Sequence, residues 1–384
     1  MPLDSASVSD IIFIIIGILG LALLMIVHEA GHLLAARAFG MRVTTFSIGF
    51  GPTFFRIEPR DGYFWFTSFG GKLRLRLGKH DEEKHGPTVY QVAMIPFLAY
   101  VQIAGMNPFE EHDPEDRGSY ANASLAGRIT TIFGGPLANY LFASVFFFFS
   151  VFYGGVRIKT DPKDPGTTTV NVVDDRPADA AGVEDGDTIV EVEGKPINTW
   201  EELRDAVSVH PEEAITVVVE REGERIPLEM TPEKSEGDPE RGIIGVGLKE
   251  ERRDVGAGEA AKLAVTRPPM VVRDLAVGIY DMIRGKVEAK LGGPVKIVQT
   301  SARAAKRGWA DWLELLGFLS AYLGAFNLIP FPALDGGRLV FLGYELATRR
   351  RPDAKMEAQI HVVGLLMLLG LMFYVTIFND LLGK

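Results

Sequence analysis

The sequence contains no cysteine. This absence excludes a disulfide framework, a thiol nucleophile and a metal site built from thiolates. The first ten positions contain no Lys or Arg, and no small-residue cleavage site follows the first apolar run. A secretory signal peptide needs both features, so we expect the first apolar run to remain in the protein as a membrane helix.

The apolar residues occur in blocks, although the hydrophobic share of 47% is ordinary. Four of these blocks are long enough to cross about 30 Å of hydrocarbon. We therefore predict a membrane protein, mainly α-helical, with four transmembrane helices and one inserted soluble domain. The predicted segments are a first transmembrane helix in 1–40, a cytoplasmic or membrane re-entrant β region in 41–125, a second transmembrane helix in 126–154, a small β-rich domain in 165–252, a connector with amphipathic helices in 253–310, a third transmembrane helix in 311–345 and a fourth in 357–380.

Charge is distributed unevenly along the chain. Residues 155–256 hold 13 Lys and Arg against 26 Asp and Glu, whereas the remainder is slightly basic. The acidic domain would repel phosphate, so nucleic-acid binding is not expected. Basic residues gather after the first apolar block and between the last two, and the positive-inside rule places those loops in the cytoplasm. Both termini and the acidic domain are then expected outside the cytoplasm.

Two regions between the apolar blocks have local signals of regular structure. Residues 63–77 predict a hairpin around Gly70 and Gly71, because its second arm alternates basic residues with leucine. This hairpin is either a re-entrant element, whose backbone is satisfied by protein or a water cavity, or a peripheral hairpin on the lipid headgroups. In the acidic domain, Thr199 and Glu202 predict a capping box at the start of a short helix.

The strongest chemical signal is the motif His28-Glu29-Ala30-Gly31-His32 in the first apolar block. Two histidines four residues apart share one face of a helix and can bind one metal ion. Glu29 lies beside a ligand and can act as a general base toward water. Ionisable residues are expensive inside a membrane and are functional by default. We therefore interpret the motif as a metal centre.

A catalytic zinc site needs a third protein ligand and keeps one position open. The other five histidines have no supporting context: His80, His85, His112, His210 and His361. Asp335 is the better candidate, because it follows the third apolar block in a stretch that two prolines and two glycines must interrupt. The charge-based topology places Asp335 and the HEAGH motif at the same membrane depth. We predict that Asp335 completes the ligand set with the two motif histidines.

The combination of motifs resembles the site-2 protease family over nearly the whole chain. It consists of the HEAGH motif, Gly134-Gly135-Pro136-Leu137-Ala138-Asn139, Gly292-Gly293-Pro294-Val295, and Asn327-x-x-Pro330-x-x-x-Leu334-Asp335-Gly336-Gly337. The most similar type is the bacterial regulator-of-sigma-E protease with PDZ domains. Residues 165–252 resemble one PDZ domain, where the better-known type has two.

This resemblance implies an intramembrane zinc metalloprotease, located as a multi-pass protein in the bacterial inner membrane with its active site towards the cytoplasm. It assigns Zn²⁺ to His28, His32 and Asp335 and makes Glu29 the catalytic base. For substrate binding it implies Asn139, Asn327, Tyr100 and Pro330. An asparagine near the metal can stabilise a developing oxyanion. The alternative for Asn139 is helix–helix packing at a crossing of small residues.

The β region resembles a re-entrant element that offers an edge strand to an unwound substrate. The family usually has Gly-Gly-Tyr where this chain has Leu98-Ala99-Tyr100. This departure affects the geometry of the strand and its subsite preference.

The expected substrates are single-span membrane proteins, such as anti-sigma factors trimmed outside the membrane or remnant signal peptides, cut in regulated intramembrane proteolysis. Membrane lipid surrounds the spans, and the PDZ domain either binds peptides or acts as a size filter, which its acidity favours. One alternative is a catalytically silent PDZ-bearing scaffold or chaperone, which would need a closed four-ligand site. Another is an ion transporter, which would need repeated broken spans that the sequence does not show.

Overall fold

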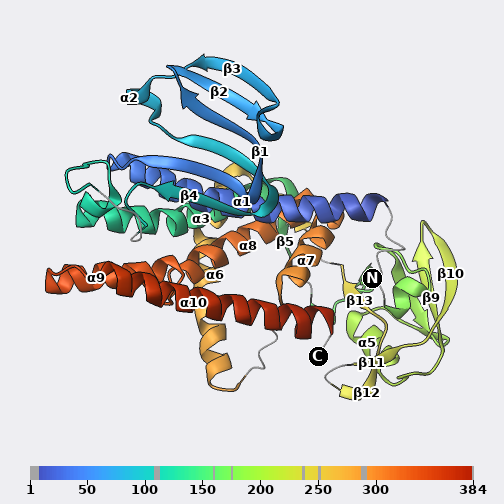
Figure 1. Ribbon diagram of the computed structural model, residues 1–384. Coiled ribbons are helices and arrows are strands. Elements are labelled where there is room, and N and C mark those ends of the chain that lie inside the picture. Colours follow the sequence, from blue (N-terminus) through green and yellow to red (C-terminus); the bar gives the residue numbers. More distant parts are fainter. Residues whose placement is uncertain are drawn as a thin grey trace. The chain divides into compact units, whose positions relative to one another are not determined.

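The computed structural model describes residues 8–107, 113–158, 161–173, 176–235, 238–249, 252–286 and 292–382. The chain forms two compact units, one of Met1–Gly154 with Val255–Lys384 and one of Gly155–Asp254. The first unit contains the long helices and one β-sheet, and the second is a small β-rich unit inserted between two helices (Figure 1).

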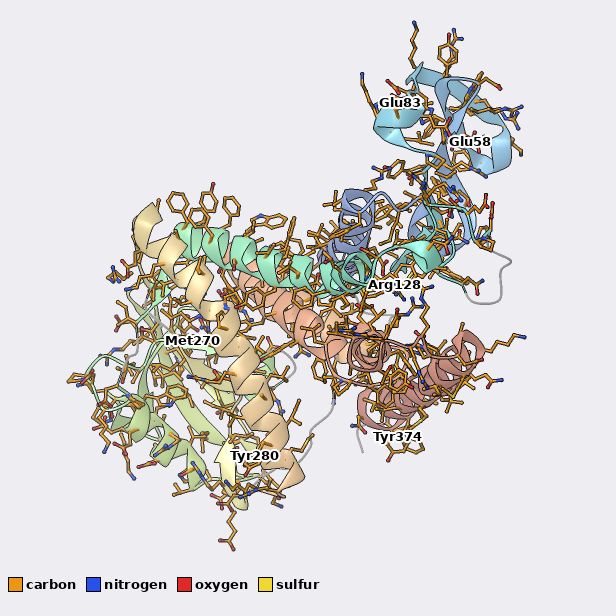
Figure 2. All side chains as sticks on the ribbon, turned by 90° about the vertical axis from the view of Figure 1, so that its left-hand side faces the viewer. Glu58, Glu83, Arg128, Met270, Tyr280 and Tyr374 are labelled. Carbon is orange, nitrogen blue, oxygen red and sulfur yellow. The ribbon has the colours of Figure 1, made fainter. Side chains whose placement is uncertain are left out.

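The helices of the first unit pack around α1 and α3. Their bounds are α1 Val8–Ala38, α2 Glu82–His85, α3 Leu125–Gly154, α6 Ala257–Ile283, α7 Pro294–Arg307, α8 Trp309–Asn327, α9 Asp335–Thr348 and α10 Ala354–Val375, with the short segments η2 Phe69–Gly71, η3 Tyr120–Asn122 and η4 Thr376–Leu381. Leu24, Phe146 and Leu316 form a buried cluster where α1, α3 and α8 meet. Helix α6 crosses α3 at a steep angle in both views (Figures 1 and 2). These contacts make α1, α3 and α8 the centre of the bundle.

Three helical segments among the described residues are long and apolar enough to cross a membrane. They are Ile11–Ala38, Leu125–Gly154 and Ala354–Asp380, which correspond to the first, second and fourth predicted spans. The predicted third span is not among them, because α8 carries Asp311 and Glu314 near its start and ends at Asn327. The predicted total of four transmembrane helices therefore stays a prediction, whereas the three apolar helices are those of a membrane protein.

The β region of the first unit is a sheet of four strands rather than a single hairpin. The strands are β1 Val43–Arg60, β2 Tyr63–Ser68, β3 Leu73–Lys79 and β4 Val89–Ile103, in the order β3-β2-β1-β4. The predicted hairpin over 63–77 corresponds to β2 and β3, and the structure adds β1 and β4. In Figure 2, Glu58 and Glu83 lie at the end of this region farthest from Arg128 on α3. Strand β4 is the edge that lies beside α1.

Both β1 and β4 change partners along their length. Residues 45–48 of β1 pair with residues 99–102 and also with residues 89–92, and residues 53–57 pair again with residues 90–93. The turn in β1 is made at Gly49 and Gly51, which both have positive φ angles, of 90° and 94°. The end of β4, residues 99–103, is thereby placed at the outer edge of the sheet, next to α1.

The second unit is built on its own hydrophobic core. Its elements are β5 Val156–Arg157, β6 Val170–Val172, α4 Pro177–Ala180, β7 Thr188–Val192, β8 Lys195–Pro196, α5 Trp200–Ser208, β9 Ile215–Arg221, β10 Glu224–Met230, β11 Glu233–Ser235, β12 Asp238–Ile243, β13 Val246–Leu248 and β14 Arg252–Arg253. The main sheet has the order β10-β9-β7-β8, and β5 pairs with β14 where the chain enters and leaves the unit. Fully buried Val170, Ile189 and Val217 belong to one core cluster. The predicted capping box of Thr199 and Glu202 is present at the start of α5.

A buried carboxylate in this unit depends on one arginine. The Asp187 side chain is only 2% exposed and accepts two hydrogen bonds of 2.8 Å from Arg221. The guanidinium of Arg221 therefore holds the pKa of Asp187 below its ordinary value. A carboxylate pKa that falls on folding stabilises the folded state above the unfolded value of about 3.9, and this stabilisation is lost as the pH falls through the folded pKa.

We expect Arg221→Gln to destabilise the second unit near neutral pH, because Asp187 keeps its charge but loses its bidentate partner. Between about pH 5 and pH 2 the variant should lose less further stability than the wild type, since the linked term is already absent. Hydrogen exchange of β9 amides in the full chain, corrected for intrinsic rates, measures both effects. Arg225→Gln on β10, at an exposed position, is the matched control. Equal behaviour of the two variants would contradict the role given to the Arg221–Asp187 pair.

Candidate metal centre

Three ligand-type side chains converge between α1 and the start of α9. The Nε2 atoms of His28 and His32 lie 3.2 Å apart. The Oδ2 atom of Asp335 lies 3.1 Å from Nε2 of His28 and 3.4 Å from Nε2 of His32. Residues 307 positions apart in sequence therefore meet at one point, as the ligand prediction requires.

The two histidines point in one direction because α1 is a regular helix through this segment. Positions i and i+4 lie one above the other on a helix face. His28 is 5% exposed and His32 is 7% exposed, so their rings are removed from solvent. Ionisable side chains buried in an apolar helix are costly and are functional by default, which makes this pair a candidate metal site.

Helices α1 and α3 approach each other closely at Gly31 and Gly134. A Cβ atom added to Gly134 would lie 2.7 Å from the carbonyl oxygen of Gly31, and one added to Gly31 would strike the carbonyl of Gly134. Side chains at either position would push the helices apart. Glycine is therefore required here by the contact between the two backbones.

This crossing places one face of α3 against the histidine rings. Gly135 lies directly over them, since a Cβ atom there would be 2.8 Å from Cε1 of His28 and still nearer to His32. One turn before Gly135, the carbonyl oxygen of Thr131 lies 2.8 Å from Nδ1 of His32. One turn after it, the side-chain amide of Asn139 lies 3.1 Å from Nδ1 of His28. Each ring is thus held from the side opposite to its Nε2 atom.

Asp335 is delivered by a break between two helices. Helix α8 ends at Asn327 and α9 begins at Asp335, so the predicted interruption by prolines and glycines is present. Ala333 in this break has a φ angle of +78°, which is unfavourable for a residue with a side chain. The strain lies two residues before the carboxylate and is maintained by the surrounding structure.

The donor set fits a zinc ion. Two imidazole nitrogens and one carboxylate oxygen are the ligand types of catalytic zinc sites with an open fourth position. Oδ2 of Asp335 is buried and has no hydrogen-bond partner among the described residues, although it faces both rings. A buried carboxylate oxygen without a donor is costly unless a cation compensates it. The residues present therefore fit the metal that the sequence predicts.

Glu29 follows the ligand His28 on α1 and contacts the sheet. Its Oε2 atom accepts a hydrogen bond of 3.0 Å from the backbone N–H of Val101 on β4. The carboxylate predicted to be the general base is thus fixed between the metal centre and the end of β4. The sequence gives no signal for the Val101 contact, because it depends on the strand register.

The four residues predicted to bind substrate lie in different surroundings. Asn139 is fully buried against His28. Tyr100 lies on β4 with its hydroxyl bound to Gln91, and Asn327 donates from its side chain to the carbonyl of Leu323 at 3.0 Å. Pro330 is exposed in the break between α8 and α9. Among the described contacts, only Asn139 touches a predicted metal ligand.

The sequence analysis did not identify Thr131 as part of the site, and it named Gly135 only as a member of the motif at residues 134–139. A signal was available, since Thr131, Gly135 and Asn139 are spaced at i, i+4 and i+8 and repeat the spacing of the two histidines. Two helices that cross with matching periods present matching faces.

An ion pair joins α3 to the later part of α9. Arg128, labelled in Figure 2, donates to both carboxylate oxygens of Glu345, at 2.6 and 2.9 Å. Both side chains are largely buried, at 8% and 11% exposure. A cavity of about 360 Å³ next to this pair is lined by Tyr120, Arg338 and His361, among others, and by none of the three ligands. This cavity is therefore distinct from the three-ligand cluster.

Comparison with known proteins agrees with this geometry. The family model described as "Peptidase family M50" matches residues 16–371. "Putative zinc metalloprotease R01501" of Rhizobium meliloti is 36% identical over 350 residues, which cover 86% of each chain. "Putative zinc metalloprotease Atu1380" of Agrobacterium fabrum is 32% identical over 96% of this chain and 95% of its own. A relative from Clostridium acetobutylicum with a name of the same kind, CA_C1796, is 26% identical over 95% of this chain and 96% of its own.

We expect Gly135→Ala to weaken zinc binding by roughly 10- to 100-fold, because the new methyl group must displace the histidine rings. Competition with a chromophoric chelator on the purified protein measures the affinity. Gly343→Ala is the matched control, since a Cβ atom at that helical position in α9 meets nothing within 4 Å. Zinc affinity that is unchanged in Gly135→Ala would contradict the packing described for the two rings.

Proposed function

Because this chain belongs to peptidase family M50, the site-2 protease family, and is a zinc metalloprotease, we propose that it cleaves peptide bonds within the transmembrane segments of other proteins. The observation that supports this proposal is the position of the histidine pair. His28 and His32 lie on Ile11–Ala38, a helix long and apolar enough to cross a membrane. A peptidase site built on such a helix meets substrates at the depth of the bilayer.

In the proposed reaction each residue of the centre has one role. His28, His32 and Asp335 bind the zinc ion. When bound, Zn²⁺ polarises the scissile carbonyl group and lowers the pKa of water at the site. Glu29 takes the proton of the attacking water and passes it to the leaving amine. A structural zinc would need a fourth protein ligand, and the cluster contains three in the described part of the chain.

The end of β4 is suited to hold an extended substrate. Val101 directs its N–H away from β1 to Glu29. In an antiparallel pair the backbone N–H and C=O groups of alternate residues point to the same side, so Ala99 also directs its N–H and C=O outward. A substrate segment that adds to this edge gains backbone hydrogen bonds in an extended form. A peptidase needs that form, because the carbonyl groups of a helix are already hydrogen-bonded. The proposal assigns strand addition to residues 99–103, beside Glu29, and not to the β2–β3 hairpin.

We also propose that α8 is a fourth span, enclosed by other helices. Its residues Leu316, Ser320 and Ala321 are fully buried against the bundle, which reduces the apolar surface that it must offer to lipid. The positive-inside rule then places the loop at 349–355 and the metal centre towards the cytoplasm of a bacterial inner membrane. Under this rule the second unit and both termini are outside the cytoplasm. The second unit then acts as a PDZ-like domain that limits the size of substrates. Single-span membrane proteins in regulated proteolysis are the substrates consistent with this arrangement.

We expect Glu29→Gln to retain zinc but to lower the cleavage rate about 10²- to 10⁴-fold, because an amide cannot accept the proton of water. The assay uses detergent-solubilised protein, a panel of tagged single-span substrates and the zinc content of each variant. Glu83→Gln is the matched control, since Glu83 lies on the short helix α2, far from the long helices that carry the metal ligands (Figure 2). A Glu29→Gln variant with wild-type cleavage would show that another group is the base.

A second expectation concerns the substrate. Replacing a leucine near the cleavage position by glycine should raise the cleavage rate, because glycine disfavours the helix by about 1 kcal/mol, or about fivefold. Paired substrates that differ only in this residue, cleaved by the same preparation, measure the effect. Equal or slower cleavage of the glycine substrate would contradict strand addition to β4.

A further inference from the structure

We propose that Asn139 is a positioning residue for the metal ligand His28, which it holds through a hydrogen bond from the Nδ1–H group to the side-chain oxygen. This inference rests on the proposed function in one respect, namely that His28 binds zinc through Nε2. It assigns to Asn139 a role other than the substrate contact that the sequence predicts.

His32 shows what such a role requires. Its Nδ1 atom lies 2.8 Å from the carbonyl oxygen of Thr131, which can only accept a hydrogen bond. The proton of the neutral ring therefore sits on Nδ1, and Nε2 keeps the lone pair that faces His28 and Asp335. Metal-bound histidines commonly have their second nitrogen fixed in this way, which sets both the tautomer and the ring orientation.

His28 has no backbone carbonyl in the same position and meets Asn139 instead. The side-chain amide of Asn139 lies 3.1 Å from Nδ1 of His28, on the side of the ring opposite to the ligand cluster. Asn139 stands eight residues after Thr131, so both partners lie on one face of α3. The two rings are thus held by equivalent contacts, one from a backbone oxygen and one from a side chain.

The hydrogen bonds of the Asn139 side chain point to a specific orientation. The residue is 0% exposed, and its Oδ1 atom is buried with no partner among the described residues. Zinc binding through Nε2 requires a proton on Nδ1, which is a donor and cannot face the amide N–H. A half-turn of the amide group brings Oδ1 to this proton. Metal binding therefore selects the orientation that gives the orphaned oxygen its partner.

The surroundings of Asn139 favour positioning over substrate contact. Its backbone carbonyl accepts a hydrogen bond of 2.8 Å from Ser320 on α8, which fixes this turn of α3. A Cβ atom on Gly324 would lie 3.5 Å from Cβ of Asn139, so α8 covers the residue. Because α1, α3 and α8 enclose this side chain, it affects the reaction by positioning His28 and not by contacting the substrate.

The test compares zinc binding in variants of the full-length protein. Asn139→Leu keeps the volume but removes the acceptor, and we expect its zinc affinity to fall by roughly 10- to 100-fold. Asn139→Asp restores an acceptor and should bind zinc nearly as the wild type does. Asn198→Leu makes the same substitution at an exposed asparagine of the second unit, which accepts a hydrogen bond from Gly166, and should leave zinc affinity unchanged. Chelator competition gives the affinities, and the visible spectrum of the Co²⁺-substituted protein reports the ligand geometry. If Asn139→Leu does not fold, Asn139→Ala replaces it.

Each outcome decides the matter. A weakened and spectrally altered Asn139→Leu, rescued in Asn139→Asp, supports the proposal. Asn139→Leu with wild-type zinc affinity and spectrum overturns it, and a loss of cleavage in that variant would assign Asn139 to the substrate. Equal loss of zinc in the leucine and aspartate variants also overturns it, because the acceptor would then be irrelevant. A wild type that binds zinc but cleaves no membrane substrate would refute the proposed function and leave this comparison valid.

Discussion

The backbone contact between Gly31 of α1 and Gly134 of α3 is the constraint on which the site depends. Polar ligands inside a membrane helix need partners, and water does not supply them in hydrocarbon. The crossing of two glycines brings α3 near enough to supply a carbonyl, an asparagine and a flat surface to the two histidine rings. A larger residue at the crossing would separate the ligands from every group that orients them.

The third ligand, Asp335, depends not on close helix packing but on a break between two helices. A continuous helix through residues 327–335 would carry Asp335 past the histidines, whereas the break turns the chain so that the carboxylate lies at the first turn of α9. The strained φ angle of Ala333 and the Arg128–Glu345 ion pair show what this geometry requires. The break is locally unfavourable and is held by packing and charge around it.

The sequence predicts this site better than it predicts the sheet, for a physical reason. The HEAGH motif and Asp335 are recognisable because helix periodicity and proline chemistry are local properties of the chain. The double pairing of β1 with β4 and the contact of Val101 with Glu29 depend on register between distant segments, which no local pattern specifies. The same distinction explains why only the β2–β3 hairpin, joined by a short turn, is predicted.

The hydrogen bond from Val101 to Glu29 connects the sheet to the chemistry. An extended segment that adds to residues 99–103 can pair with the outward groups of Ala99 and the C=O of Val101, while the N–H of Val101 stays with Glu29. In the proposed reaction a substrate strand therefore pairs beside a carboxylate that the same strand positions. Because one edge strand orders both the substrate backbone and Glu29, cleavage is restricted to segments that can unwind into that edge.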